Sequence, residues 1–308
     1  MKQSANESTF SLPDDTPLAR ELADLTARRK RLADVTVEFT GQTRVMTISN
    51  QKGGVGKTTT TVNTAAAIAS LGGRVLVIDL DPQGNASTAL GVPHTADTPS
   101  IYDVLIDDFP IADVIQQSPE HENLFCVPST IHLAGAEIEL VSQVAREHRL
   151  KTALDDFRGA QEQQFDFILI DCPPSLGLLT INAFTAADEV FLPIQAEYYA
   201  LEGLSQLLGN IRMIQKHLNP RIHVSTILLT MYDGRTRLAQ QVAEEVRSHF
   251  PDEVLDTVIP RSVRVSEAPS FGQTVITYDG GSAGAVAYRE AAVEIINRAT
   301  KRAKEGTS

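Results

Sequence analysis

A glycine-rich segment early in the chain has the residue types of a phosphate-binding loop. It reads Asn-Gln-Lys-Gly-Gly-Val-Gly-Lys-Thr-Thr over residues 50–59 and lies between an apolar run at 45–49 and a helix-forming run that begins at Thr58. Glycines let successive backbone N–H groups converge on anionic oxygens, and the N-terminus of a following helix adds a positive partial charge. The pattern predicts a site for nucleotide phosphates.

Individual side chains of this loop have predicted roles. Lys57 would reach the outer phosphates, and the Thr58 hydroxyl would ligate magnesium. The general pattern G-x-x-x-x-G-K-[ST] requires glycine where this chain has Gln51, and Lys52 follows that position. Lys52 could neutralise charge in the transition state, in cis or from a facing subunit, or it could be a solvated loop lysine. The predicted nucleotide contacts are Lys52, Gly53, Gly54, Val55, Gly56, Lys57, Thr58 and Thr59.

Carboxylates follow two apolar runs that are typical of buried strands. The run 75–78 leads into Asp79 and Asp81, and the run 165–170 leads into Asp171. In open α/β sheets, ligands bind at the C-terminal ends of the strands. Of Asp79 and Asp81, one would order the magnesium shell and the other would orient the attacking water, and Asp171 would be the second magnesium-side carboxylate. If the strand continues, Asp79 and Asp81 share a face; alternatively they cap the next helix.

The elements that must position these groups alternate between strands and helices, which is typical of a mostly parallel sheet with helices on both faces. We predict strands at 45–49, 75–78, 165–170, 189–194, 224–230 and 254–259. We predict helices at 58–71, 201–217, 237–250 and 285–304, and loops at 92–98 and 278–284. The sequence therefore predicts an α/β fold of the P-loop NTPase type, in one domain over 44–304 with a tail at 305–308.

The first 43 residues are predicted to be an extension of that domain. Residues 1–15 are polar and offer little to bury. Thr16-Pro17 reads as a helix start, leucines follow with helical spacing, and a basic cluster at 28–31 ends the run. This short amphipathic helix either packs on the main domain or docks on a partner, on DNA or on a membrane surface.

The length, composition and net charge of the chain limit the classes of protein to which it can belong. With 308 residues and 42% apolar content, the chain can bury a large core. The N-terminus is polar and no run of apolar residues is long enough for a membrane span, so we expect a cytoplasmic protein. Cys126 and Cys172 lack metal-site spacing and should be reduced thiols. The net charge of −12 excludes a uniformly basic nucleic-acid-binding protein but allows a local basic patch.

Four separated motifs together resemble the ParA/Soj family of DNA-partitioning ATPases. They lie at 50–60, 77–85, 170–175 and 259–270, and the resemblance extends over about residues 44–301. It implies a deviant-Walker ATPase that uses ATP and Mg²⁺, has weak intrinsic activity and closes into a nucleotide sandwich homodimer. It also implies that the ATP dimer binds nucleoid DNA without sequence preference, and that a ParB-type partner stimulates hydrolysis and release. The short N-terminal extension favours a chromosomal over a plasmid cargo.

The resemblance also implies roles for residues of this chain. Lys52 would reach across to the ATP of the partner subunit, and Asp81 would position the hydrolytic water. Thr58 would bind magnesium directly, and Asp171 would belong to the second switch. DNA contact would fall on Arg235 and Arg264. The adenine is expected near Met231 and Pro260.

Simple chemistry makes the arginines plausible DNA contacts. Arg235 and Arg237 precede a predicted helix, and Arg261 and Arg264 follow a predicted strand. Dimerisation could join two such sets into one basic stripe, in which each phosphate contact adds about one unit to the salt dependence of binding. Alternatively, all four are ordinary surface residues in ion pairs. We expect DNA contact for Arg235 and Arg264 and leave the other two open.

Three other classes of protein share parts of this pattern. A MinD-like membrane ATPase has a similar loop, but residues 300–308 lack the large apolar side chains of a membrane-seeking tail, so membrane binding is not favoured. An iron–sulfur reductase of the nitrogenase type needs two ligand cysteines per subunit at a dimer interface. This class is not favoured, because Cys126 belongs to no recognisable ligand motif that would accompany Cys172. A scaffold that merely holds ATP would not need Asp81, Lys52 and Lys57 together.

Overall fold

The computed structural model describes residues 16–160, 163–197 and 200–305. The chain divides into two units, one ending at Val35 and the other beginning at Thr36. The first unit contains helix α1, Pro17–Ala33, at the place where the sequence predicts a helix. The Thr16 hydroxyl accepts a hydrogen bond from the N–H of Ala19, and proline at the first helical position needs no N–H partner.

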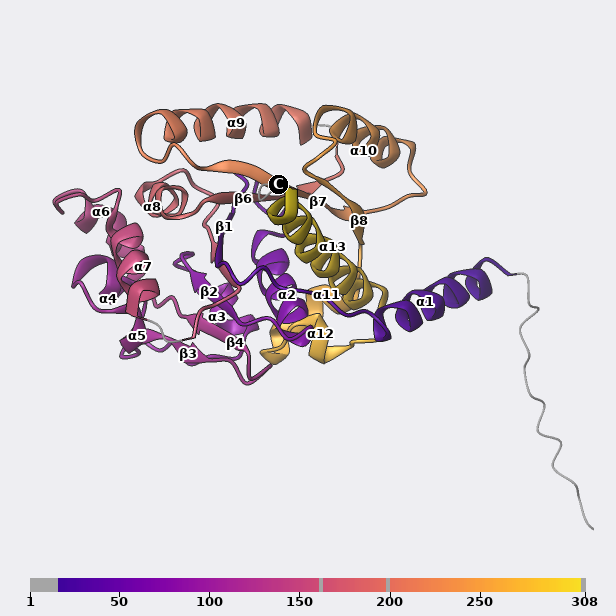
Figure 1. Cartoon of the computed structure of the whole chain (residues 1–308), viewed down its shortest axis with the longest axis horizontal. Coiled ribbons are helices and arrows are strands. Elements are labelled where there is room, and N and C mark those ends of the chain that lie inside the picture. Colours follow the sequence, from indigo (N-terminus) through magenta and orange to yellow (C-terminus); the bar gives the residue numbers. More distant parts are fainter. Residues whose placement is uncertain (1–15, 161–162, 198–199, 306–308) are drawn as a thin grey trace, which may run out of the picture. The chain divides into compact units, whose positions relative to one another are not determined.

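The second unit is built on a sheet of eight described strands in the order β3-β4-β2-β5-β1-β6-β7-β8 (Figure 1). All neighbouring strands are parallel except β3 and β4. The prediction of an α/β fold with a mostly parallel sheet is confirmed. The strands are β1 Arg44–Ile48, β2 Val75–Asp79, β3 Gln116–Gln117, β4 Leu124–Val127, β5 Phe167–Asp171, β6 Glu189–Gln195, β7 His223–Tyr232 and β8 Val254–Pro260.

The four longest helices of this unit lie where they are predicted, namely α2 Lys57–Ser70, α9 Ala200–His217, α10 Arg237–His249 and α13 Ala283–Glu305. Shorter helices that the sequence did not predict are α3 Asn85–Ala89, α4 Ile101–Ile106, α5 Ile111–Val114, α6 Leu133–Leu140, α7 Arg149–Ala160, α8 Leu178–Ala186, α11 Val263–Glu267, the 3₁₀ turn η1 Ala268–Phe271 and α12 Val275–Tyr278. The loop predicted at 278–284 is wrong in extent, because α12 includes Tyr278 and α13 begins at Ala283.

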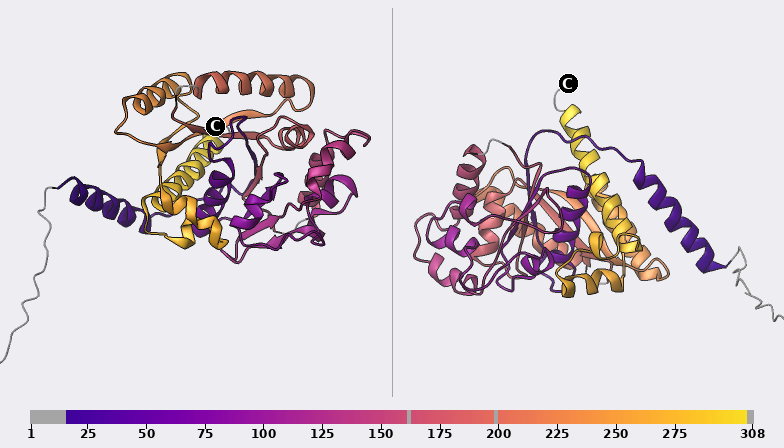
Figure 2. Two further views of the ribbon diagram at one scale, coloured as in Figure 1. Left: turned by 180° about the vertical axis from the view of Figure 1, so that it is seen from behind. Right: turned by 90° about the horizontal axis from the view of Figure 1, so that it is seen from below.

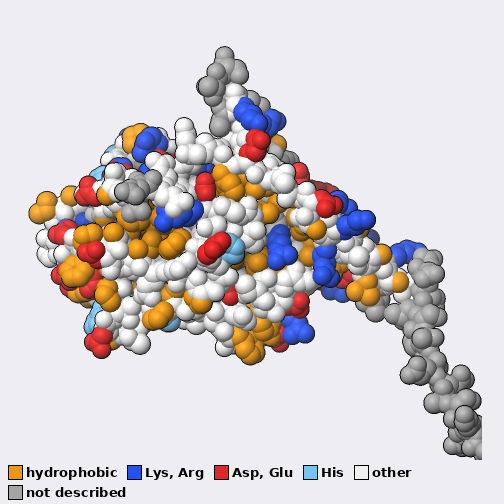
Figure 3. All heavy atoms as spheres, turned by 60° about the horizontal axis from the view of Figure 1, so that its bottom comes forward, with side chains coloured by type: hydrophobic (Ala, Val, Ile, Leu, Met, Phe, Trp, Pro, Cys, Tyr) orange, Lys and Arg blue, Asp and Glu red, His pale blue; other side chains and the backbone are white. Residues whose placement is uncertain are grey.

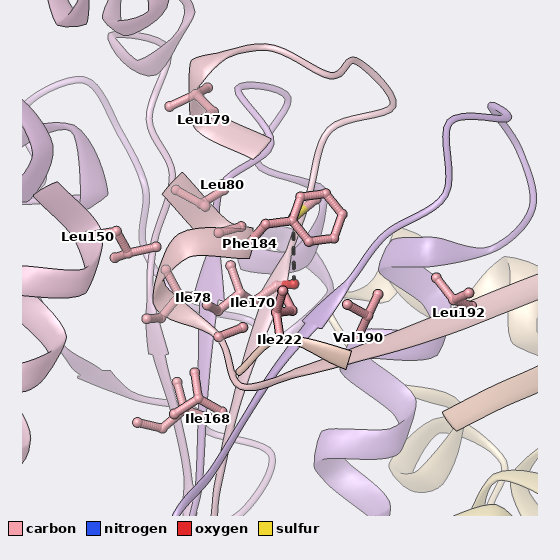
Figure 4. Packing of buried hydrophobic residues seen from close by; sticks show 14 of the residues in the cluster. Ile78, Leu80, Leu150, Ile168, Ile170, Leu179, Phe184, Val190, Leu192 and Ile222 are labelled. Carbon is pink, nitrogen blue, oxygen red and sulfur yellow. Dashed lines mark hydrogen bonds between the residues drawn. The ribbon is translucent and has the colours of Figure 1, made fainter. Parts of the chain in front are cut away.

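The helices cover both faces of the sheet, as two views in Figure 2 show. Side chains alternate along each strand, so the two faces belong to two separate hydrophobic cores. In β5, Ile168 and Ile170 point into a core formed with α4 to α10, and Figure 4 shows Ile170 near Phe184 of α8. Phe167 and Leu169 point into the other core, which contains α2, α3 and α11 to α13. Cys126 and Cys172 are buried free thiols.

Strand β1 occupies the middle of the sheet and determines where the phosphate loop lies. It pairs with β5 on one side and with β6 on the other. Ile48 at its end is opposite Asp171 of β5, and in the next pair of strands Asp171 is opposite Asp79 of β2. The loop that follows β1 therefore emerges at the same edge of the sheet as both carboxylates.

Candidate functional site

The phosphate loop joins β1 to α2 and leaves the N-terminus of α2 without a side-chain cap. Gly54 and Gly56 have φ values of 74° and 87°, a left-handed conformation that side chains rarely adopt. A Cβ added at Gly53 or Gly54 would meet no atom within 4 Å, so this side of the loop is open. Uncapped N–H groups at the positive end of a helix dipole, facing open space, fit the phosphates of a nucleotide.

Neighbouring strands hold the loop in place. The Asn50 amide donates to the carbonyl oxygen of Pro193 in β6 over 2.9 Å and accepts from the N–H of Lys52 over 3.0 Å. From β7, the Thr230 hydroxyl donates to the carbonyl oxygen of Val55 over 2.8 Å. Three contacts from outside the helix therefore fix the loop before any ligand binds, which lowers the entropy cost of binding.

Lys57 lies inside the loop. Its side chain is 7% exposed, and Nζ donates to the carbonyl oxygen of Lys52 over 3.3 Å. Burial lowers the pKa of Lys57, and the nearby carboxylates of Asp171 and Asp81 oppose that shift. Lys57 therefore lies beside the N-terminus of α2, and its contact with a phosphate oxygen stays a prediction.

Asp171 is the centre of a hydroxyl–carboxylate cluster. The hydroxyl of Thr58 donates to its Oδ2 over 2.7 Å, and the hydroxyl of Thr61 donates to its Oδ1 over 2.9 Å. Burial is the main reason that the pKa of Asp171 rises to about 8, and the charge of Asp79 raises it further. The pKa of Asp79 rises to about 6, also chiefly through burial. Two buried carboxylates of like charge favour a bound cation.

The oxygen donors of this cluster fit magnesium. Hydroxyl and carboxylate oxygens are its preferred ligands, and it is usually held by one or two carboxylates together with substrate phosphates and water. No group of three or more His, Cys, Asp or Glu side chains that could hold a metal occurs among the described residues. Thr58 and Asp171 are the residues that would hold the ion.

Strand β2 ends at Asp79, so the condition under which Asp79 and Asp81 would share a face is not met. The Oδ1 atom of Asp79 accepts from the N–H of Asp81 over 3.1 Å. Its Oδ2 accepts from the N–H and the hydroxyl of Ser87 over 2.8 and 2.7 Å. Asp79 thus caps helix α3, the alternative that the sequence left open, and its role as a metal ligand stays a prediction. Asp81 is 8% exposed, and its Oδ1 accepts from the N–H of Gln83.

Lys52 forms an ion pair that the sequence analysis missed. Its Nζ lies 2.6 Å from Oε2 of Glu197, and the two side chains are 43% and 46% exposed. Glu197 follows the C-terminal end of β6, so the rule that located the strand-end aspartates could have located it too. Thr61 and Ser87 are also missed, and no motif marks either of them.

The two predicted adenine residues lie at the ends of neighbouring strands. Met231 has a φ of 50° near the end of β7, and its methyl carbon is 3.8 Å from the position of a Cβ on Gly56. Pro260 ends β8 and pairs with Tyr232. Met231 is therefore beside the phosphate loop, while contact of either residue with an adenine stays a prediction.

Arg235 and Arg264 follow β7 and β8, and both form ion pairs within the chain. Arg235 is on the turn before α10 and pairs with Asp233 over 2.8 Å; its hydrogen bonds lower the pKa of Asp233 to about 2. Arg264, in α11, lies 3.2 Å from Glu267 and 3.4 Å from Asp279. Exposed pairs of this kind are weak, so either arginine could exchange its partner for a phosphate. Their contact with DNA stays a prediction.

Replacing Asp171 with asparagine is expected to weaken the pH dependence of stability in the nucleotide-free protein. The folded-state pKa of about 8 lies above the usual value, so the protonated carboxyl stabilises the folded state. That contribution is complete below about pH 4 and is lost as the pH rises through about 8. Between about pH 6 and pH 9 the native chain should lose about 2 kcal/mol more unfolding free energy than the variant.

Thermal and urea unfolding across this pH range measure the difference. Asp155→Asn, a change at an exposed carboxylate of α7, is the control and should follow the native chain. Equal pH profiles for Asp171→Asn and the native chain would contradict the expectation.

Comparison with known proteins finds one matching family model and several similar proteins. A family model described as an AAA domain matches residues 43–224. The sporulation initiation inhibitor protein Soj of Bacillus subtilis (strain 168) is 55% identical over 252 residues, which are 82% of this chain and 98% of that protein. The chromosome partitioning protein ParA of Caulobacter vibrioides (strain NA1000 / CB15N) is 50% identical over 259 residues, 84% of this chain and 96% of that protein.

A solved structure of similar fold carries a nucleotide. It is cobyrinic acid a,c-diamide synthase from Mycobacterium smegmatis with bound ADP and magnesium, with a TM-score of 0.71 and 37% identity. The match covers 84% of this chain and 96% of that one. In the described part of this chain, no helix is both long and apolar enough to cross a membrane.

Proposed function

Because this chain belongs to the ParA/Soj family of chromosome-partitioning ATPases, we propose that it is an ATP-driven switch that moves DNA cargo. In the proposed cycle the chain binds ATP with Mg²⁺, dimerises around the nucleotide and binds nucleoid DNA without sequence preference. A ParB-type partner then stimulates an otherwise slow hydrolysis, and the DNA is released. Nucleotide binding alters the dimer equilibrium because the nucleotide contacts both subunits only in the closed state.

One observation carries the proposal. The hydroxyls of Thr58 and Thr61 converge on the buried carboxylate of Asp171, at the open N-terminus of α2 and beside Lys57. Such a cluster is costly to bury without a cation, and a purely structural loop would not need it. It supports a site that holds a metal–phosphate ligand.

The residues of the chain divide the chemistry among them. Bound magnesium supplies charge neutralisation on the phosphates. Lys57 and the N–H groups of the loop orient the phosphates, and Thr58 and Asp171 hold the ion. Asp81 lies just past the end of β2, where it would orient the attacking water and accept its proton. Lys52 would stabilise charge on the nucleotide of the partner subunit.

The Lys52–Glu197 pair has a consequence for this cycle. If Lys52 reaches a partner's nucleotide, it must first leave Glu197. The pair is half exposed, so breaking it costs at most about 1 kcal/mol. Formation of the closed dimer therefore loses the energy of this ion pair, and that cost is absent in a chain without Glu197.

Replacing Glu197 with glutamine is expected to strengthen ATP-dependent dimerisation by up to about thirtyfold, because two such pairs break in each dimer and about 2 kcal/mol in total corresponds to that factor. Sedimentation velocity over a concentration series with a slowly hydrolysed ATP analogue measures the change. Glu245→Gln, on an exposed turn of α10, is the matched control. A weaker dimer in Glu197→Gln would mean that the carboxylate supports closure instead of opposing it.

Co-sedimentation tests the DNA part of the proposal. The native chain is spun with random-sequence DNA, and separately with anionic liposomes, in ATP and in ADP. We expect DNA binding in ATP only, and its loss in the double variant Arg235→Glu, Arg264→Glu. Each arginine that contacts a phosphate should contribute about one unit to the slope of log affinity against log salt. Liposome binding without DNA binding would replace the proposal with a membrane-associated ATPase.

A further inference from the structure

A cavity of about 590 Å³ lies between the segment that joins α4 to α5 and helix α7. Its walls are mostly apolar and include Val104, Phe109, Val144, Ala153 and Phe157. No residue of the phosphate loop and none of the three strand-end aspartates lines it. A volume of this size is typical of ligand-binding pockets. The cavity is therefore a second candidate binding site, separate from the nucleotide site.

Apolar side chains at the mouth of this cavity are exposed. Phe109 is 45% exposed and Val144 is 87% exposed. Figure 3 shows hydrophobic side chains gathered on the left, the side on which α4 to α7 lie in Figure 1. Grouped apolar side chains around a hollow mark interaction sites more often than single exposed ones do.

Backbone strain marks the same place. Three described residues other than glycine have a positive φ, namely Asp108 at 59°, Ala145 at 50° and Met231 at 50°. Met231 lies at the phosphate loop, whereas Asp108 and Ala145 both line the cavity. Left-handed backbone at alanine is unfavourable, and such residues cluster at functional sites where the surrounding structure holds them. Two residues of the cavity wall, Asp108 and Ala145, are thus held in a backbone conformation that is unfavourable for their residue types.

Among the described residues that line the cavity, Arg149 is the cationic one, and its guanidinium group already has partners. Arg149 donates to the carbonyl oxygens of Leu105 and Ile106 at the end of α4 and pairs with Asp108 over 2.6 Å. Its side chain is 12% exposed. Arg149 therefore closes the C-terminus of α4 and contributes little positive charge to the cavity mouth.

The cavity wall carries an exposed carboxylate. Asp156 lines the cavity from α7 and is exposed, whereas the exposed Asp107 and Asp113 only neighbour the lining residues Asp108 and Ala112 in the sequence. None of these three carboxylates has an ion-pair partner among the described residues. The neighbouring Asp155 differs, because it pairs with Lys151 over 2.8 Å and does not line the cavity.

We propose that this cavity binds a cationic amphipathic segment of a partner protein. The apolar side chains of that segment enter the hollow, and a Lys or Arg side chain of the segment meets Asp156. An apolar groove with charged edges is the usual receptor for such a helix, in which side chains at helical spacing act as anchors. The charge of Asp156 selects basic over acidic segments, because like charges across an interface oppose binding.

Helix α8 lies between the chain segment that forms this wall and the loop after β5. Asn182 of α8 donates to the carbonyl oxygen of Arg146 over 2.7 Å and accepts from the N–H of Leu150 over 3.1 Å. Thr180, on the same helix, donates to the carbonyl oxygen of Ser175 over 2.6 Å. Ser175 belongs to the loop that follows Asp171. Helix α8 thus bonds both to residues next to the lining residues Ala145 and Arg149 and to the loop that follows Asp171.

Binding can be measured without nucleotide, so its failure and a failure of the proposed ATPase cycle are distinguishable. The probe is a fluorescently labelled synthetic helix of leucine and lysine, with leucines at helical spacing. A leucine–glutamate helix of the same pattern and a leucine–lysine peptide of scrambled order are the controls. On the native full-length chain, fluorescence anisotropy should give saturable binding of the first peptide and at least about tenfold weaker binding of both controls.

Two neighbouring residues of α7 give matched variants. Asp156→Lys and Asp155→Lys make the same charge change on exposed side chains, but only Asp156 lines the cavity. We expect Asp156→Lys to weaken binding of the leucine–lysine helix by at least about tenfold, and Asp155→Lys by less than about threefold. Equal weakening in both variants, or no weakening in either, would overturn the proposal.

A tryptophan at the cavity mouth reports occupancy directly. The chain contains no tryptophan, so Phe109→Trp introduces a single emitter at the proposed contact. Its emission should shift to shorter wavelength as the leucine–lysine helix binds, with the same midpoint as the anisotropy. Saturable anisotropy without a change in this emission would place the peptide elsewhere and overturn the proposal.

Discussion

Replacing Asp81 with alanine is expected to lower ATP turnover by at least about a hundredfold, because removing a general base usually lowers the rate by at least that factor. The affinity for ATP should change by no more than a few fold. Asp81 is 8% exposed just beyond β2, and its Oδ1 is held by the N–H of Gln83. No described residue donates a hydrogen bond to its Oδ2, so this oxygen is available to a water. The phosphate contacts come from other residues, which is why binding should survive.

The variant has a second expected property. A chain that binds ATP and does not hydrolyse it should remain in the closed state, so Asp81→Ala should accumulate as a DNA-bound dimer in ATP. Phosphate release, binding of a fluorescent ATP analogue and co-sedimentation with DNA measure the three properties. Asp97→Ala, at an exposed loop carboxylate, should behave as the native chain. Normal hydrolysis by Asp81→Ala would remove this residue from its proposed role.

Replacing Lys52 with alanine is expected to abolish the ATP-dependent dimer while the monomer stays folded. The Lys52 contacts that shape the loop use its backbone, since its N–H donates to Asn50 and its carbonyl oxygen accepts from Lys57. Its side chain contacts Glu197 through an exposed ion pair. Truncation should therefore leave the phosphate loop intact and remove only the ammonium group that would reach the partner's nucleotide.

Light scattering coupled to size exclusion, in ATP and in ADP, measures this effect. The dimer fraction in ATP should fall to the level seen in ADP, and the unfolding temperature without nucleotide should change by no more than a few degrees. Lys151→Ala, which removes an exposed ion-paired lysine of α7, is the matched control. Persistence of the dimer in Lys52→Ala would place the subunit contact on other residues.

The central strands and the nucleotide loop could be predicted from the sequence because several signals coincide there. Apolar runs bounded by glycine or by acidic residues locate β1, β2 and β5 to within about two residues, the usual limit for element ends. The same runs end in Asp79 and Asp171, and parallel strands bring such residues to one edge.

Other features could not be predicted, because they depend on contacts between distant segments. Helices such as α3, α5 and α11 span a single turn or slightly more, too few residues for a clear helical period. The orientation of Asp79 depends on Ser87, whose N–H and hydroxyl donate to Oδ2 of Asp79 from within helix α3. Glu197 meets Lys52 from the end of the neighbouring strand β6, which is about 145 residues away in the sequence, and no local pattern records that contact.

The position of β1 between β5 and β6 also affects how the protein is made. The ribosome completes β1 and the loop after it early, but both neighbours of β1 belong to the range 167–195 and emerge much later. At about 5–20 residues per second, the nascent chain carries an unpaired central strand for on the order of ten seconds. Only when β6 emerges can this apolar segment be enclosed. Truncated chains that end before residue 189 should therefore depend on chaperones and fail to retain ATP.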